Sequence, residues 1–287
     1  MNDRWTKISL LTLLACCLAA GGALAAGQGT YSAGLFQLGD GLAPPGFRGA
    51  ADILGTPGQS GPDWADLFTA EGRPRDIGRY GGRWAVFIAD DVSMGSGFEG
   101  TALAGSPDLV RNGKAAAAHD IGNAYAYGTK NAAGQSVLYL GVERLSGSNS
   151  YVEFELNQAV ARLGHGGYGL GKPWRVLGAR ATNDVLVRLD FASGKLASVS
   201  FHRWREGKWR LTTAVAGEAC NEAETLCAIS NAAAIEGGPW HPAEIAPGRF
   251  AEVGVNIGKL LKADPALKSL RIRTPGDIAL GYLKEGN

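Results

Sequence analysis

Glu153 and Glu155 are the two side chains of this sequence whose spacing most resembles a catalytic pair. Glycosidases use two carboxyl groups held ~5 to 9.5 Å apart across the scissile bond. Alternate residues of a strand share a face, and the rise of a strand would separate these two by roughly 7 Å. Their alternation with Val152, Phe154 and Leu156 is also typical of a strand with one solvated face. We favour the solvated face and keep a polysaccharide-acting enzyme, a glycoside hydrolase or a lyase, as the alternative.

Other catalytic motifs are weak or missing. Gly164, Gly166 and Gly169 form a dinucleotide-type pattern, but that motif must lead into a helix, and Pro173 follows instead, so we predict a loop. The sequence has neither a G-x-S-x-G elbow nor an H-E-x-x-H zinc motif. A Ser-His-Asp triad assembled in space stays open, with four histidines to draw on: His119, His165, His202 and His241. We predict that the protein is not an enzyme, with no catalytic residues and no cofactor.

Aromatic rings are candidates for ligand binding, because sugar faces stack on flat rings while polar groups take the hydroxyls. The candidates by pattern are Tyr125, Tyr127, Tyr151, Trp204 and Trp240. Trp204 alternates out of phase with Val199 and Phe201, so it should point to the other face of its strand. That face is either an exposed binding surface or a second buried one.

Three aspartates could hold a structural calcium ion, since calcium prefers oxygen ligands in turns. They are Asp90, Asp91 and Asp120, which we place at strand ends or in loops. Capping of turns by aspartate explains the same residues without metal. Glu143 and Arg144 are most simply interpreted as an ion pair beside a central strand.

The elements that must position these residues are mostly strands. The sequence has 43 glycines among 287 residues, roughly twice the usual share near ~7%, which indicates many turns. Apolar runs at 84–88 and 137–142 predict central strands, and 185–191, 197–201 and 209–215 predict a meander of three. Ser193-Gly194 and Glu206-Gly207 fall where its turns should be.

Helix is scarce, with residues 257–270 the best short case and Pro265 set to interrupt it. The stretch 27–76 is rich in glycine and proline and is interpreted as a meandering approach to the sheets. We predict an all-β fold: an antiparallel two-sheet β-sandwich of jelly-roll or lectin type, with at most one short C-terminal helix.

The first 25 residues are typical of a signal peptide. Arg4 and Lys7 precede an apolar run too short to span a membrane, and Ala23-Leu24-Ala25 is a cleavage signal. Lipidation at Cys16 is the alternative. We therefore expect residues 26–287 to form one secreted domain, in the periplasm, on the cell surface or outside the cell. Without the signal its basic and acidic residues balance, so nothing indicates nucleic acid or an anionic membrane surface as partner.

Cys220 and Cys227 are the cysteines left after such cleavage. An oxidising compartment favours a disulfide between them. A zinc site would need further ligands, and no nearby pair of histidines supplies them.

Short segments spread over the chain resemble a family of secreted bacterial β-sandwich proteins, largely uncharacterised, that stand alone or precede repeat-bearing surface regions. The matching segments are FQLGDG (36–41), GPDWADLF (61–68), HDIGNAYAY (119–127), LYLGVERLSGSNSYVEFELNQ (138–158), NDVLVRLDF (183–191), VSFHRW (199–204), the cysteine pair and FAEVGVNI (250–257). The chain departs from the family pattern in two places. It has Ala118-His119-Asp120 where the family usually has Lys-Asp-Asp, and its C-terminal segment RIRTPGDIALGYLK is poorer in serine and arginine than is usual in the family. The resemblance implies a lectin-like sandwich on or outside the cell, with no established chemistry.

These observations together predict a secreted or cell-surface binding module that does not turn over its ligand. A glycan or another envelope component is the expected partner. A purely structural envelope or matrix protein is a further alternative.

Overall fold

The structure is a computed structural model that describes residues 30, 35–38, 51, 53–54, 61–89, 118–160, 162–164, 175–177, 180–240, 244–275 and 278–283. For 162–164, 175–177 and 278–281 only the backbone is described. The predicted signal segment 1–25, Asp90 and Asp91 lie outside these residues, as do His165 and His241.

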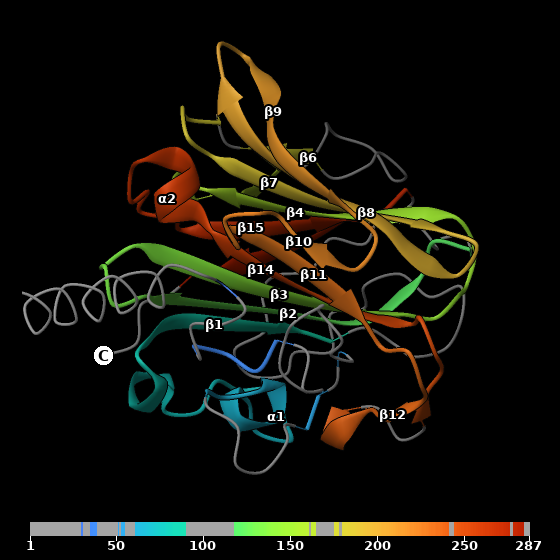
Figure 1. Ribbon diagram of the computed structural model, residues 1–287. Coiled ribbons are helices and arrows are strands. Elements are labelled where there is room, and N and C mark those ends of the chain that lie inside the picture. The colour runs from blue at the N-terminus through green and yellow to red at the C-terminus, as the bar shows by residue number, and fades with distance from the viewer. Residues whose placement is uncertain are drawn as a thin grey trace, which may run out of the picture.

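Two six-stranded antiparallel sheets form the body of the molecule (Figure 1). The first sheet runs, in spatial order, β1 (Gly82–Ile88), β2 (Ile121–Lys130), β3 (Ser136–Arg144), β14 (Phe250–Asn256), β11 (Leu226–Ser230) and β10 (Ala219–Cys220). The second runs β16 (Ile278–Tyr282), β15 (Ser269–Arg273), β4 (Ser150–Asn157), β7 (Val185–Ala192), β8 (Lys195–Arg205) and β9 (Lys208–Ala216). Short pairs are β5 (Arg162–Gly164) with β6 (Arg175–Leu177), and β12 (Ile235–Glu236) with β13 (Glu244–Ile245). The predicted all-β sandwich is confirmed.

The core between the sheets follows directly from the alternation of apolar residues. Val152, Phe154 and Leu156 of β4 are all buried in one cluster with Leu138 and Leu140 of β3. Because each strand has a period of two, these side chains leave the intervening residues on the outer faces. The predicted inward set of β4 is confirmed.

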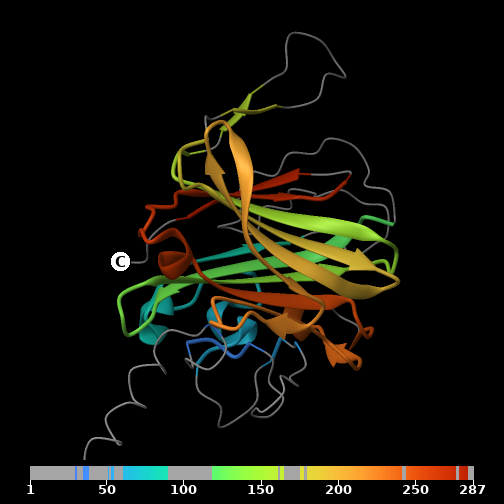
Figure 2. The ribbon, with the colours of Figure 1, turned by 45° about the horizontal axis from the view of Figure 1, so that its top comes forward.

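A third layer covers the outer face of the first sheet (Figure 2). It contains the helix α1 (Trp64–Leu67), the 3₁₀ turns η1 (Ile77–Tyr80) and η2 (Gly238–Trp240), and Phe36. Trp64 is fully buried, and its indole Nε1 donates to Glu252 Oε1 of β14 at 2.6 Å. This layer explains why all nine residues of β3 are buried.

The third layer also corrects two expectations. The apolar run at 84–88 forms β1, which lies at the edge of the first sheet and not in its centre. A continuous apolar run indicates a strand that is buried on both faces. A central strand has this property, and so does an edge strand that another layer covers. In addition, α1 is a helix beyond the single C-terminal one expected.

The C-terminal helix α2 (Ile257–Leu261) is shorter than predicted. Asn256 caps its first turn by accepting from the Lys259 amide, and Lys262 ends it in the left-handed conformation. Leu270 belongs to β15. The leucines beyond Lys262 therefore pack from an extended chain, and their helical spacing was coincidental.

The meander β7–β8–β9 is confirmed with its two turns. Ser193 and Gly194 have φ of 51° and 78°, and Glu206 and Gly207 have φ of 52° and 73°. Positive φ at both central residues matches the twist of the flanking strands in a two-residue hairpin. A break in register between Phe201 and His202 turns Leu211 outward, where it is 62% exposed.

Candidate functional site

The outer face of the second sheet carries the densest group of charged side chains in the described part of the chain. Pairing across the strands places Arg273 of β15 and Arg188 of β7 on either side of Glu153 of β4. Arg271 lies opposite Glu155 in the same way. Opposite charges therefore alternate across the sheet, which is the favourable cross-strand arrangement.

Glu153 is held by arginines on both sides. Arg273 Nε donates to Glu153 Oε2 at 2.7 Å, and Arg273 Nη2 also donates to that oxygen. Arg188 Nη1 donates to Glu153 Oε1 at 3.1 Å, while its Nε donates to Asp190 at 2.9 Å. Hydrogen bonding to Asp190 raises the pKa of Arg188, with the charge of Glu153 adding to it. Glu153 is 4% exposed even though it lies on an outer face.

Glu155 is bound by a second set of donors. Arg180 Nε and Nη2 donate to its two oxygens at 2.7 and 2.8 Å, a bidentate geometry. Arg271 Nη1 lies 3.4 Å from Oε1, and Asn157 Nδ2 donates to the same oxygen at 3.2 Å. The hydrogen bonds to Glu155 raise the pKa of Arg180. Burial lowers the pKa of Arg271, and Glu155 is the main charge opposing that effect.

These contacts change the interpretation of the two glutamates. They share a face as predicted, but that face is not an ordinary solvated one, because the arginine side chains cover both carboxylates. Both carboxylates act here as hydrogen-bond acceptors from guanidinium groups. The structure presents them as anchors for four arginines: Arg180, Arg188, Arg271 and Arg273. The sequence analysis missed these arginines, although Arg271 and Arg273 alternate along their strand like the glutamates.

Two tryptophans lie on the same face beside this network. Trp204 and Trp209 are cross-strand partners with ring centroids 5.2 Å apart, edge to face. The Arg180 guanidinium lies 5.0 Å from the Trp204 ring and 5.3 Å from the Trp209 ring. Both rings are half-buried. Tyr151 is also half-buried and has Arg188 4.1 Å from its ring centre. The predicted outward orientation of Trp204 is correct, and Trp209 joins it through the register shift.

Of the other aromatic candidates, Tyr125 and Tyr127 face the third layer, so the expectation that they are exposed is wrong, whereas Trp240 belongs to that layer. Tyr125 and Tyr127 are fully buried. The Tyr125 hydroxyl donates to Glu143, and burial raises its pKa well above the ordinary value. Trp240 is half-buried against Phe87, with centroids 5.0 Å apart. Tyr125 and Tyr127 offer no open face because the third layer, which periodicity does not reveal, covers that side of the first sheet.

Of the three candidate calcium ligands, the structure describes Asp120 alone, so the predicted calcium site stays a prediction. Asp120 is 3% exposed at the start of β2, and Asp90 and Asp91 fall outside the description. Within the described part, no three His, Cys, Asp or Glu side chains could hold a metal ion. His119 Nδ1 lies 3.0 Å from Ser150 Oγ.

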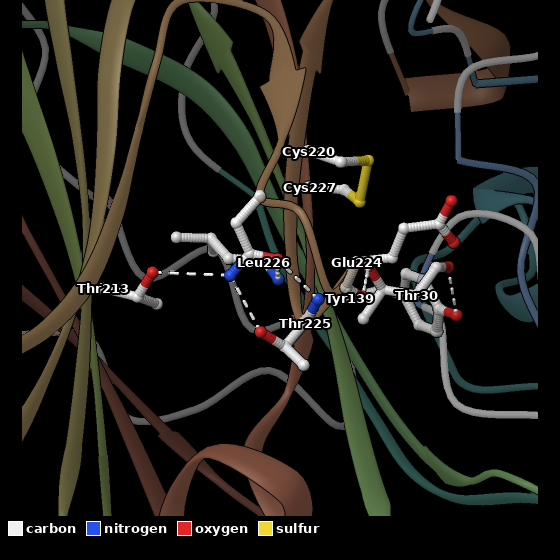
Figure 3. Close-up of a disulfide and its surroundings, with 9 residues drawn as sticks. Thr30, Tyr139, Thr213, Cys220, Glu224, Thr225, Leu226 and Cys227 are labelled. Atoms are coloured by element: carbon white, nitrogen blue, oxygen red, sulfur yellow. Dashed lines mark hydrogen bonds between the residues drawn. A yellow bond between two sulfur atoms is a disulfide. The ribbon is translucent and has the colours of Figure 1, made fainter. Parts of the chain in front are cut away.

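The predicted disulfide between Cys220 and Cys227 is confirmed (Figure 3). The two cysteines are direct partners across β10 and β11, at the edge of the first sheet. Close by, Thr30 Oγ1 donates to the Glu224 carbonyl, and the Tyr139 hydroxyl donates to the Thr30 carbonyl at 2.9 Å. The disulfide therefore holds together the β10–β11 hairpin, which Thr30 contacts.

Comparison with protein families, curated proteins and solved structures finds no match to this chain. The resemblance to secreted sandwich proteins stays a prediction. No helix in the described part of the chain has the length and apolar character to cross a membrane. The fold and its charged face define a three-layered antiparallel β-sandwich with an arginine–carboxylate surface on its second sheet.

Proposed function

We propose that this protein is a secreted or cell-surface module that binds a glycan or another envelope component and does not turn it over. The observation that carries the proposal is the pair of half-buried rings, Trp204 and Trp209, beside Arg180 on the outer face of the second sheet. Rings next to fixed polar groups are what sugar recognition requires, because the rings take the apolar face and the polar groups take the hydroxyls.

The arginine network supports a binding role because it is arranged before any ligand arrives. Arg180 is fixed by two bonds to Glu155, so little side-chain freedom is lost when a ligand contacts it. His202 Nε2 lies 2.9 Å from Ser200 Oγ on the same face and adds further polar groups. Trp204 and Arg180 would form the centre of the binding surface, with Tyr151 at its far side.

The same network weighs against the alternative of a glycosidase. A general acid must carry a proton to the leaving group. In this structure Glu153 and Glu155 both accept bonds from arginines, and a carboxyl group in that role is not placed to donate.

The test is a binding and turnover screen of the secreted domain against polysaccharides and isolated envelope. Trp204→Ala should weaken binding at least fivefold, the change in affinity that a loss of ~1 kcal/mol or more produces when a central ring is removed. Trp204→Phe keeps a ring and should retain most of the affinity. Leu211→Ala is the matched control, because Leu211 is exposed on the same hairpin and lacks a ring. Sugar release that disappears in Glu153→Gln would contradict the non-catalytic proposal.

A further inference from the structure

Arg144 and Arg249 form a pair of like charges at one end of the first sheet, away from the outer face of the second sheet. Arg144 ends β3, and its backbone amide donates to the carbonyl of Arg249, the residue just before β14, at 2.7 Å, so the two residues lie side by side. Like charges in such neighbouring positions are destabilising unless something compensates them.

Arg144 is unusually enclosed for an arginine. It is 4% exposed, its guanidinium carbon lies 4.0 Å from the centre of the Phe191 ring, and its Nη2 donates to the Ser148 carbonyl. Its Nη1 is buried and has no hydrogen-bond partner in the structure. Burial, with the charge of Arg249 second, lowers the pKa of Arg144 to about 10. Such an environment leaves a positive charge poorly compensated.

Arg249 has the same deficiency. Its Nη1 is also buried without a hydrogen-bond partner, and its guanidinium would lie 3.0 Å from a Cβ added at Gly147. Among the described residues, neither Arg144 nor Arg249 forms an ion pair with a carboxylate. The expected Glu143–Arg144 ion pair is therefore wrong. Glu143 lies on the opposite face of β3, where it accepts from Asn123 and Tyr125.

The two arginines open onto a hollow of about 180 Å³. Its lining also contains Glu143, whose carboxylate is engaged with Asn123 and Tyr125, and Glu244, which is exposed to water. Leu145, Ile245 and Ala246 also line it. The hollow therefore combines two arginines, each with one buried Nη1 that lacks a hydrogen-bond partner, with apolar side chains, and low polarity strengthens a charged hydrogen bond.

We infer that this hollow is a binding site for an oxyanion group, a carboxylate, sulfate or phosphate, held between Arg144 and Arg249. The planar fork of a guanidinium matches such groups in shape and charge. An anion there would neutralise the repulsion between the two arginines. The inference does not depend on the proposed function, because it uses another part of the molecule.

The experiment titrates phosphate, sulfate and acetate into the protein at constant ionic strength, balanced with sodium chloride, and follows the thermal midpoint together with calorimetric binding. Phosphate and sulfate also stabilise proteins non-specifically by exclusion from the surface, so a saturable response is required. The wild type should saturate with at least one of the three anions. Arg249→Gln should bind that anion at least tenfold more weakly. Arg249 donates no hydrogen bond from its side chain to a described residue, so the substitution breaks none within that part.

Two further variants keep the test decisive. Arg205→Gln removes an exposed arginine at the tip of the β8–β9 hairpin and should leave anion binding unchanged. Arg249→Lys keeps the charge without the fork and should bind with intermediate strength. Competition by dextran sulfate, but not by dextran, would show that the anion is taken as a substituent of a polymer, and binding of free ions alone would show a free-ion site. Failure of all three anions to saturate, or equal binding by wild type and Arg249→Gln, would overturn the inference.

Discussion

Glu155→Gln should destabilise the fold far more than Glu153→Gln, although the two glutamates share a face and a strand. The difference lies in their arginines. Arg271, which faces Glu155, has a side chain only 9% exposed, whereas the side chains of Arg273 and Arg188 around Glu153 are 48% and 35% exposed. When the carboxylate is removed, an exposed arginine regains water, but a buried one cannot.

The magnitudes follow from this contrast. Breaking a buried pair by removing one partner costs ~3 to 5 kcal/mol. Glutamine still offers one oxygen to Arg180, so we expect a loss of about 3 kcal/mol for Glu155→Gln, the lower end of that range. For Glu153→Gln the exposed partners limit the loss to ~1 kcal/mol. Glu206→Gln is the control, because that side chain is 78% exposed and its pair with Arg210 should contribute less than ~0.5 kcal/mol.

The assay is urea unfolding of the three variants with Arg271→Gln and the Glu155→Gln/Arg271→Gln double variant. A double-mutant cycle isolates the coupling between Glu155 and Arg271, which should exceed ~1 kcal/mol. The double variant should therefore be more stable than the sum of its two changes indicates. An equal or larger loss in Glu153→Gln, or additive effects at Glu155 and Arg271, would refute the reasoning from burial.

Three further outcomes are expected. Cys220→Ser with Cys227→Ser should cost no more than ~2.5 kcal/mol, because the cysteines are only 7 residues apart in sequence and the closed loop is short; the untreated protein should show almost no free thiol, and two reactive thiols would contradict the bond. Burial lowers the pKa of His202, so stability should fall as pH drops through the usual histidine range near ~6.5, where the unfolded chain binds the proton more readily. Unfolding at pH 7.5 and 5.5 should show a smaller fall in His202→Gln, and an equal fall would exclude this linkage. Gly128→Ala should lower the thermal midpoint strongly, because its Cβ would lie 2.6 Å from Cζ2 of Trp84, and an unchanged midpoint would mean that the ring moves aside at little cost.

The strands of the second sheet could be predicted because local signals agree there. Turn residues with positive φ stand between runs of alternating apolar residues, as at Gly194 and Gly207. The alternation in β4 also placed Glu153 and Glu155 on one face. The disulfide was predicted because Cys220 and Cys227 are the two cysteines outside the predicted signal segment and the expected compartment is oxidising.

The parts that could not be predicted depend on contacts between distant segments. Nothing near Tyr125 in the sequence shows that Trp64 and Phe68 pack over it. A strand buried on both faces has no periodicity, so the edge position of β1 was also hidden. The partners of Glu155 come from a neighbouring strand and from Arg180, which precedes β7, and a pairing register is needed to bring them together.

The bond between the Trp64 indole and Glu252 joins residues that are 188 positions apart in the chain. During synthesis, which runs from the N-terminus, α1 leaves the ribosome long before β14 exists. The buried side chains of α1 therefore cannot pack against the complete first sheet until β14 has been made. Contacts between such distant residues slow folding. The first helix among the described residues can therefore complete its contacts only after β14 has been made, and a stalled or truncated chain would leave its apolar surface open to aggregation.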